Sequence, residues 1–314
     1  MLERGNKFIE KWMALVTPLC MLVGISFPDV ATHGLPYVTV VFAFITFTGA
    51  LKSEFKDILR VFHDPKPLLC MLVMIHVVIP AAACGAGHLF FGSDPYAITG
   101  MVLEFSVPTA VVGLMWVTIY NGNNPLSLSL VVIDTILSPF LIPVTLRVLV
   151  GSQVEIDATM MMRQLIFMVA LPAIAAMVLN QVTHGAVKNT WPKKLALFSK
   201  FALMFVVTSN SSKVAPYVRH MNLERVAIGA AILVLAAGSY ALGWDVARVL
   251  HQDKETTISM IYGTGMRNIS TGAVIAGACF PGAVMYPVMI GTLFQQMLAA
   301  LYGKVLVSKL EERH

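Results

Sequence analysis

Apolar runs of about 17–25 residues recur along the whole chain, which is the length that a helix needs to cross the hydrocarbon core of a bilayer. Of the 314 residues, 57% are hydrophobic and 12% are charged, and a soluble domain of this composition would lack polar surface. A spanning segment must satisfy its own backbone hydrogen bonds, so such runs form helices. The sequence therefore predicts an all-α membrane protein with a single transmembrane domain over residues 1–314.

Ten spans are predicted, separated by short loops that are rich in Gly, Pro, Asn and Asp. The basic residues before the first span resemble the start of a signal peptide, but no small-residue cleavage site follows, and we expect this span to be retained. The predicted spans cover residues 12–27, 36–51, 67–91, 96–120, 125–150, 158–183, 196–212, 224–247, 256–278 and 283–306.

Lysine and arginine are distributed unequally over the two faces that these spans define. With the N-terminus in the cytoplasm, sixteen of the 22 Lys and Arg residues lie on the cytoplasmic side and five on the outside, and Arg267 lies within a span. This bias follows the positive-inside rule. It predicts a multi-pass protein of the cell membrane with both termini cytoplasmic. It also explains the basic balance of the chain without nucleic acid as a partner.

The two halves of the chain resemble each other weakly. The segment FAFITFTGALKSEFKDI from Phe42 resembles FALMFVVTSNSSKVAPY from Phe201, at an offset of 159 residues. Each half holds five spans, and because five is odd, the second half must enter the membrane the opposite way up. The pattern predicts two inverted five-helix repeats, at about 1–150 and 155–314, which are typical of secondary transporters.

Spans 96–120 and 256–278 each carry a helix breaker near the middle. Pro108 lacks an amide donor and clashes with the preceding turn, and the glycines of residues 263–265 leave helical geometry readily. The offset of 159 places Pro108 on Arg267. Unwound backbone at membrane depth survives only where protein or a wet cavity satisfies it. The two breaks therefore predict crossing helices with a binding site between them, and two ordinary kinks are the alternative.

These residues resemble the bile acid:sodium symporter family, of which the chain looks like a bacterial homologue, within the superfamily of bile acid, arsenite and auxin carriers. The best local matches are residues 265–268 (GMRN), Pro108 and residues 135–143 (TILSPFLIP), and the resemblance covers nearly the whole chain. It implies ten helices divided into a core and a panel domain, with helices 4 and 9 broken and crossing at the substrate and sodium sites. It also implies transport of a small organic anion.

Most of the positions at which the family binds sodium carry different residues here, although the hydroxyl of Ser127 is kept. In the family they hold a Ser-Asn pair after the proline of helix 4, hydroxyls on helix 5, and a Glu and a Gln that flank the Gly-Met of helix 9. The equivalent residues are Gly113, Leu114, Ser127, Val131, Gly263, Met266 and Arg267. Most of the oxygen ligands are missing, and a guanidinium would repel the ion by roughly 4 kcal/mol at about 4 Å and an effective dielectric constant of about 20. We expect little sodium there and no other cofactor.

Arg267 is predicted to act as a fixed cation in place of a mobile one. Its planar donor fork suits a carboxylate, and an intramembrane charge normally faces a cavity or a partner. Glu104, which the offset of 159 places on Gly263, and Asp134 are the candidate salt-bridge partners and proton carriers. His76 is a further candidate for a proton relay. A purely structural hydrogen bond or salt bridge is the alternative for each of these groups.

Four other polar residues are predicted to contact substrate together with Arg267. They are Thr109, Asn268, Gln295 and Gln296. The two glutamines could instead serve only to hold the tenth span in place.

The four cysteines, Cys20, Cys70, Cys84 and Cys279, lie singly in apolar segments. This favours small buried side chains over disulfides or a metal site.

Together these features predict a secondary-active transporter whose partners are a small organic anion, either bile-acid-like or a carboxylate metabolite, and the lipid bilayer. A sodium-coupled symporter with a rearranged site and a substrate sensor without transport are the alternatives. An enzyme is not indicated, because the chain has no H-E-x-x-H motif and no recognisable catalytic carboxylate pair. Span 96–120 also lacks the cysteine expected of an arsenite carrier. The oligomeric state stays open, and a monomer is compatible with the sequence.

Overall fold

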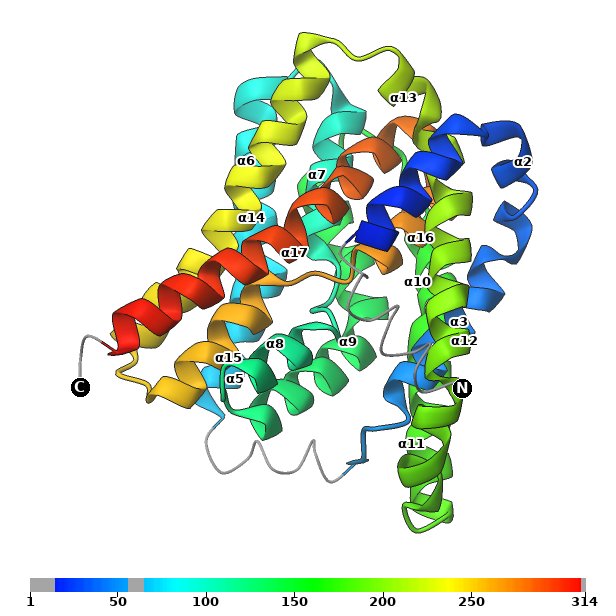
Figure 1. The fold of residues 1–314 in the computed structure, drawn as a ribbon. Helices are drawn as coiled ribbons and strands as arrows, with labels where there is room; N and C mark the ends of the chain where they lie inside the picture. Colours follow the sequence, from blue (N-terminus) through cyan, green and yellow to red (C-terminus); the bar gives the residue numbers. More distant parts are fainter. Residues whose placement is uncertain (1–14, 56–64, 312–314) are drawn as a thin grey trace.

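The computed structural model describes residues 15–55 and 65–311, and this part of the chain is helical apart from loops and one isolated bridge. Figure 1 shows the arrangement of the helices. In chain order they are Leu15–Ser26, α2 (Pro28–Thr32), η1 (Leu35–Tyr37), α3 (Val38–Ala50), α5 (Lys66–Val73), η3 (Met74–Val78), α6 (Ile79–Phe91), α7 (Pro95–Ser106), α8 (Gly113–Ile119), α9 (Asn124–Val150), α10 (Ala158–Leu165), η4 (Ile166–Ala170), α11 (Leu171–Val182), α12 (Ala186–Ser211), η5 (Ser212–Val214), α13 (Ala215–Arg219), α14 (Leu223–Val249), α15 (Lys254–Gly265), α16 (Ile269–Cys279) and α17 (Gly282–Glu311).

Seven helices of the described chain are long and apolar enough to cross a membrane, and they coincide with seven of the predicted spans. They are Pro28–Ala50, Lys66–Phe91, Asn124–Val150, Ala158–Val182, Ala186–Arg219, Leu223–Val249 and Gly282–Leu306. Two other predicted spans are each divided in two, as α7 with α8 and as α15 with α16. The first predicted span corresponds to the shorter apolar helix Leu15–Ser26. Its predicted start at residue 12 and the basic residues Arg4, Lys7 and Lys11 lie outside the described residues.

Two of the long helices contain a π-helical turn, and each of these turns directly precedes a proline. Turn η3 lies before Pro80 and turn η4 lies before Pro172. A proline has no amide hydrogen, so the carbonyl group one turn earlier loses its helical partner and the helix widens locally. For Pro80 that carbonyl belongs to His76, and Thr145 Oγ1 of α9 lies 3.5 Å from it. The proline therefore changes the helix at the residue where the sequence predicts a proton relay.

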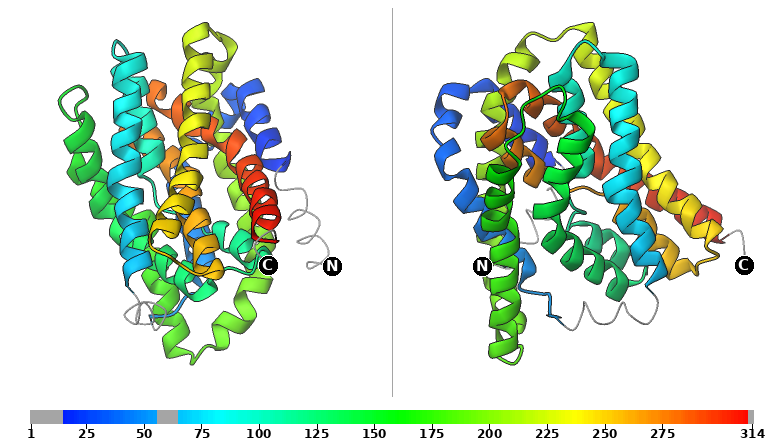
Figure 2. Two further views of the ribbon diagram at one scale, coloured as in Figure 1. Left: turned by 90° about the vertical axis from the view of Figure 1, so that its left-hand side faces the viewer. Right: turned by 180° about the vertical axis from the view of Figure 1, so that it is seen from behind.

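The connections between helices gather at two opposite ends of the molecule. The α11–α12 turn, the α14–α15 turn and the end of α17 lie at one end, while the α6–α7 and α13–α14 connections lie at the other (Figures 1 and 2). Predicted cytoplasmic lysines stand at the helix ends beside these connections, since Lys66 begins α5, Lys254 begins α15 and Lys188 lies in the first turn of α12. Lys52 follows the end of α3. This alternation is what the positive-inside count requires. The orientation in a membrane stays a prediction.

Candidate functional site

The break after α7 follows directly from Pro108. A proline disfavours helical geometry at the residue before it, and Val107 is extended, with φ −68° and ψ 153°. Helix α7 therefore ends at Ser106, and α8 begins only at Gly113. The residues between are not helical, so the predicted break at Pro108 is confirmed.

The second break lies slightly later than predicted. Helix α15 includes Gly263 and Gly265, and the unwound residues are 266–268. The expectation that the glycines themselves unwind was wrong, because they serve close packing instead. A Cβ at Gly263 would lie 2.7 Å from Leu130 Cδ2, and a Cβ at Gly265 would collide with the ring of Tyr240. The helix ends at Gly265, and the backbone of the next residue, Met266, is extended and pairs with the other break.

The two unwound segments cross and pair through their main chains. Thr109 and Arg267 form an isolated antiparallel bridge. Backbone hydrogen bonds flank this bridge on both sides, from Ala110 N–H to Met266 C=O (3.2 Å) and from Asn268 N–H to Pro108 C=O (2.7 Å). Amides and carbonyls that left a helix at membrane depth thus find partners in each other.

Side chains from the next helices satisfy the amides at the centre of the crossing. Asp134 of α9 accepts a hydrogen bond through Oδ2 from the amide of Thr109, at 2.7 Å. Gln295 of α17 accepts one through Oε1 from the amide of Arg267, at 2.9 Å. A carboxylate in one case and a carboxamide in the other therefore cap equivalent positions of the two breaks.

The other oxygen of Asp134 binds His76. The distance from His76 Nε2 to Asp134 Oδ1 is 2.6 Å, and the two residues are 6% and 0% exposed. His76 reaches α9 from the π-helical turn η3, which exists because of Pro80. The structure thus joins two of the three predicted proton carriers, which lie 58 positions apart in the chain, into one buried pair.

Arg267 lies at the crossing with a free guanidinium group. It is 2% exposed, and its three guanidinium nitrogens find no hydrogen-bond partner among the described residues. It interacts electrostatically with Asp134 and Glu104. The expected salt bridge to either carboxylate is not formed within the described chain. The two oxygens of Asp134 instead accept from His76 and from the amide of Thr109.

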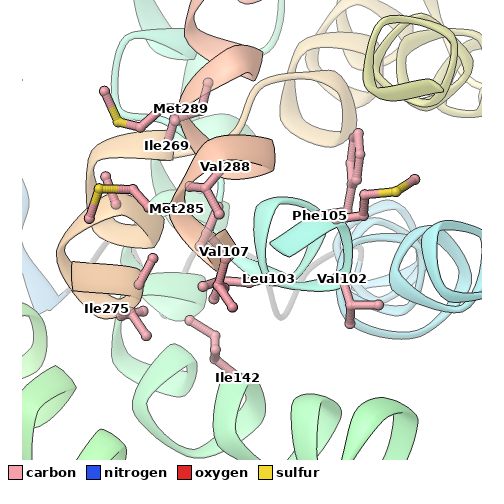
Figure 3. Packing of buried hydrophobic residues seen from close by; sticks show 14 of the residues in the cluster. Val102, Leu103, Phe105, Val107, Ile142, Ile269, Ile275, Met285, Val288 and Met289 are labelled. Atoms are coloured by element: carbon pink, nitrogen blue, oxygen red, sulfur yellow. The ribbon is translucent and has the colours of Figure 1, made fainter. Parts of the chain in front are cut away.

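Glu104 lies on α7, two residues before the end of this helix, and is buried. It is 3% exposed and packs against Gly291 of α17, where a Cβ would collide with Glu104 Oε1. Its Oε2 has no hydrogen-bond partner within the part of the chain that the structure describes. Figure 3 shows the apolar packing around this helix, where Leu103 and Val107 lie among side chains of α9, α16 and α17.

The remaining predicted substrate contacts all have structural partners. Asn268 Oδ1 accepts from the amide of Thr271 at 3.4 Å and caps the N-terminus of α16. Gln296 Oε1 accepts from Trp116 Nε1 at 3.1 Å. Through this contact Gln296 holds α17 against α8, as in the structural alternative, while its amide nitrogen can still donate to a substrate. Thr109 and Gln295 lie directly at the crossing, as described above.

Most of the sodium-equivalent positions surround one very small cavity. Its volume is about 10 Å³, roughly enough for one water molecule. Ser127 contributes a hydroxyl oxygen that has no hydrogen-bond partner in the described residues. Met266 packs beside it, near Gly113. The cavity is lined by Thr109, Ala110, Gly113, Leu114, Val117, Ser127, Leu130, Val131, Tyr262 and Gly263.

Two buried tyrosines near the site were missed in the sequence. Tyr240 OH donates to the carbonyl of Gln295 at 3.3 Å, and Tyr262 OH donates to the carbonyl of Ala299 at 3.0 Å. They attach α14 and α15 to α17 beside the second break. A tyrosine inside an apolar span needs a hydrogen-bond partner for its hydroxyl, and this signal was available in the sequence.

The family comparison covers the first half of this site. The model of the Sodium Bile acid symporter family matches residues 39–221, more than half of the chain. The chain belongs to this family. It is a family of transporters, in agreement with the membrane-spanning helices of the structure. The matched range includes the first break, His76 and Asp134, and it ends before Arg267.

Several relatives are similar over most of their length. The chain is 38% identical to the uncharacterized protein YbaS of Bacillus subtilis, over 94% of this chain and 96% of that protein. It is 23% identical to the uncharacterized sodium-dependent transporter YocS of the same organism, over 92% and 89%. It is 22% identical to the probable sodium/metabolite cotransporter BASS1, chloroplastic, of Arabidopsis thaliana, over 81% and 63%.

Proposed function

We propose that this protein is a secondary-active transporter of a small organic anion, either bile-acid-like or a carboxylate metabolite, which binds at the crossing of the two broken helices. The observation that carries the proposal is the free guanidinium of Arg267, a buried cation whose hydrogen-bond donors are unused by the described residues. A carboxylate matches this donor fork in charge and in geometry. Helix α16 begins two residues later, and its positive N-terminal end adds to the same field.

The proposed architecture is ten membrane spans in two inverted five-helix repeats. The antiparallel pairing of the two breaks supports it, because an approximate two-fold relation brings equivalent segments together in this way. Contacts between helices support a division into two groups. Helices α3, α11 and α12 pack together as a panel, and helices α6, α7, α14, α15 and α17 pack together in a core. Movement of one group against the other would give access to the crossing from alternate sides.

We further propose that sodium does not occupy the positions that bind it in the family. Sodium needs several oxygen ligands, whereas the small cavity at these positions presents the hydroxyls of Ser127 and Thr109 among mostly apolar groups. Gly113, Leu114, Val131 and Gly263 supply no side-chain oxygen. The charge of Arg267 nearby also opposes a cation. The residues present do not fit a sodium ion, and no step of the proposed transport passes through one.

A sodium-coupled symporter with a rearranged site is the second candidate. The names of the relatives YocS and BASS1, a sodium-dependent transporter and a probable sodium/metabolite cotransporter, favour it. The carbonyl groups of the unwound segments are the oxygens that such a site would have to use. A sensor that binds the anion without transport keeps the same site and differs only in flux.

Thermal unfolding of the purified protein tests these alternatives. Lactate, benzoate and cholate, three monocarboxylates with increasing apolar surface, are added in sodium and in potassium at constant ionic strength. A ligand at 100 times its dissociation constant stabilises the folded state by about 2.7 kcal/mol. We expect stabilisation by at least one probe, equal in both salts, and flux of that probe into proteoliposomes. Stabilisation in sodium alone would establish the second candidate, and binding without flux would establish a sensor.

A further inference from the structure

We propose that the imidazole Nδ1 of His76 is a proton-binding site and that proton uptake there favours anion binding at Arg267. The inference rests on the proposed function, which it deepens by naming the coupling atom and the sign of the coupling. Of the three predicted proton carriers, Glu104, Asp134 and His76, it assigns the proton to His76. The predicted cycle moves one proton together with one anion.

The contacts of Asp134 assign the hydrogen in the buried pair. A distance of 2.6 Å between His76 Nε2 and Asp134 Oδ1 requires one hydrogen between them. The second oxygen of Asp134 accepts from the amide of Thr109, and two donated hydrogen bonds favour the ionised carboxylate. The hydrogen therefore belongs to Nε2, which donates. In a neutral imidazole this leaves the lone pair on Nδ1.

His76 Nδ1 is the one ring atom at which a further proton can be added. It is buried and has no hydrogen-bond partner among the residues that the structure describes. Its position is fixed by the π-helical turn before Pro80, and the ring is held by its bond to Asp134. Binding of a proton from water at Nδ1 gives an imidazolium, which keeps the Nε2–H bond to the carboxylate. The pair then changes from a net charge of −1 to zero without losing a contact.

This charge change acts on Arg267. Helices α5, α6, α7 and α9 pack against η3, and their buried or half-buried titratable groups are Cys70, Cys84, Glu104 and Asp134 itself. Arg267 from the second break interacts with both Asp134 and Glu104. Asp134 lies beside Arg267, because it binds the amide of Thr109, which is the bridge partner of Arg267. While the pair is negative, it already balances the charge of Arg267, and a substrate carboxylate is attracted less strongly. Once His76 carries a proton, the site has a surplus positive charge that an anion neutralises.

Thermodynamic linkage gives the expected pH dependence. If each bound anion stabilises one proton on the pair, the proton must equally favour the anion. The affinity for the anion then falls by up to about tenfold per pH unit as pH rises through the titration of the pair, and it is constant at lower pH. The same protein in sodium and in potassium shows the same slope.

Two substitutions in the pair have opposite expected effects. His76→Gln keeps a donor to Asp134 and cannot take up the proton, so affinity stays at the weak, high-pH level of the wild type at every pH. Asp134→Asn keeps an acceptor for the Thr109 amide and removes the negative charge, so affinity stays near the tight, low-pH level of the wild type at every pH. A merely structural pair would weaken binding in both variants. Glu104→Gln, which alters a carboxyl group outside the pair, keeps the pH slope, as does the exposed control His88→Gln.

The experiment measures thermal stabilisation by lactate, benzoate and cholate from about pH 6 to pH 9 in the wild type and the four variants. In parallel, ¹⁵N NMR spectra of protein labelled at its histidines follow both ring nitrogens of His76. The signals of His76 are assigned as those that disappear in His76→Gln. We expect Nε2 to be protonated throughout and Nδ1 to gain its proton as pH falls. Equal losses in His76→Gln and Asp134→Asn, or an Nδ1 that never takes up a proton, would overturn the inference. Absence of stabilisation by any probe would count against the proposed function, and the ¹⁵N titration would still decide on the proton site.

Discussion

Asp134 and Gln295 perform the same task on opposite sides of one crossing, since each side chain accepts a hydrogen bond from the central amide of an unwound segment. The distances are 2.7 Å to the amide of Thr109 and 2.9 Å to the amide of Arg267. The two acceptors differ in charge, and only the carboxylate is further bound to a histidine. The crossing is therefore similar in backbone geometry on its two sides and asymmetric in electrostatics. Because only one side carries an ionisable pair, a change in the charge of His76 and Asp134 can be linked to anion binding at Arg267.

The Gln295 acceptor can be removed with little change of shape. Gln295→Met leaves the amide of Arg267 without its partner, and a buried unsatisfied amide costs about 1–3 kcal/mol. We expect a lower melting temperature and weaker anion binding, because the position of Arg267 is less well defined. Gln153→Met, the same change at an exposed residue, should alter stability by less than about 0.5 kcal/mol. Equal melting temperatures of the two variants would show that this hydrogen bond does not hold the break.

Replacement of Arg267 separates binding from stability. Arg267→Gln introduces the residue usual in the family and removes the fixed charge, and we expect anion binding to weaken by about 1.5–3 kcal/mol, as for the loss of a charge-assisted hydrogen bond. The buried carboxylates then lose the favourable field of a nearby positive charge, and we expect stability to fall. The double variant Arg267→Gln with Glu104→Gln should regain stability without regaining binding. Normal anion binding by Arg267→Gln would make Arg267 a structural residue.

Gly265 is expected to tolerate no side chain, in contrast to a glycine on the facing helix. A Cβ at Gly265 would collide with the ring of Tyr240, whereas a Cβ at Gly238 would have no atom within 4 Å. Gly265→Ala should lower stability by about 1–3 kcal/mol through overpacking. Gly238→Ala should be neutral or raise stability by up to about 1 kcal/mol through helix propensity. Thermal unfolding of both variants checks the difference, and a neutral Gly265→Ala would contradict the packing role assigned to this glycine.

The positions of the helices and of the first break could be predicted because they depend on local signals. Apolar runs of sufficient length define the spans, and Pro108 alone dictates that α7 ends at Ser106. The second break was placed too early, since the glycine signal does not distinguish unwinding from close packing. Gly263 and Gly265 stay helical and allow neighbouring side chains to approach.

The pairing of charged groups could not be predicted in the same way. The sequence indicated that Arg267, Asp134 and His76 were exceptional in an apolar chain, but not which of them would meet. That depends on the rotation of α9 and on the π-helical turn η3, which directs His76 toward Asp134. The two oxygens of Asp134 accept from His76 and Thr109, and Arg267 has no salt bridge there. Tertiary geometry therefore decides whether a buried cation is neutralised or stays free for a ligand.

Lys213 connects η5, which follows α12, to helix α16. Its Nζ, in η5 after α12, donates to the carbonyl of Gly277 near the end of α16. Lys213→Met keeps the apolar stem and removes this bond, to which a charged donor contributes about 1.5–3 kcal/mol. We expect η5 and α16 then to separate at least about tenfold more often. The readout is the rate at which a maleimide labels Cys279, two residues after Gly277, in a protein whose other cysteines, Cys20, Cys70 and Cys84, are replaced by serine. This rate should rise by the same factor.

The matched control makes the same change at the other end of the molecule. Lys188→Met breaks the 2.6 Å ion pair with Glu54, and because this pair lies far from α16, the labelling rate of Cys279 should stay at the unsubstituted level. If transport involves movement between the two groups of helices, an anion that stabilises one arrangement should change the labelling rate of Cys279 in the Lys213→Met protein. That rate should still exceed the rate in the Lys188→Met control. Equal labelling of Cys279 in both lysine variants would mean that the contact of Lys213 with Gly277 does not restrain this end of the molecule.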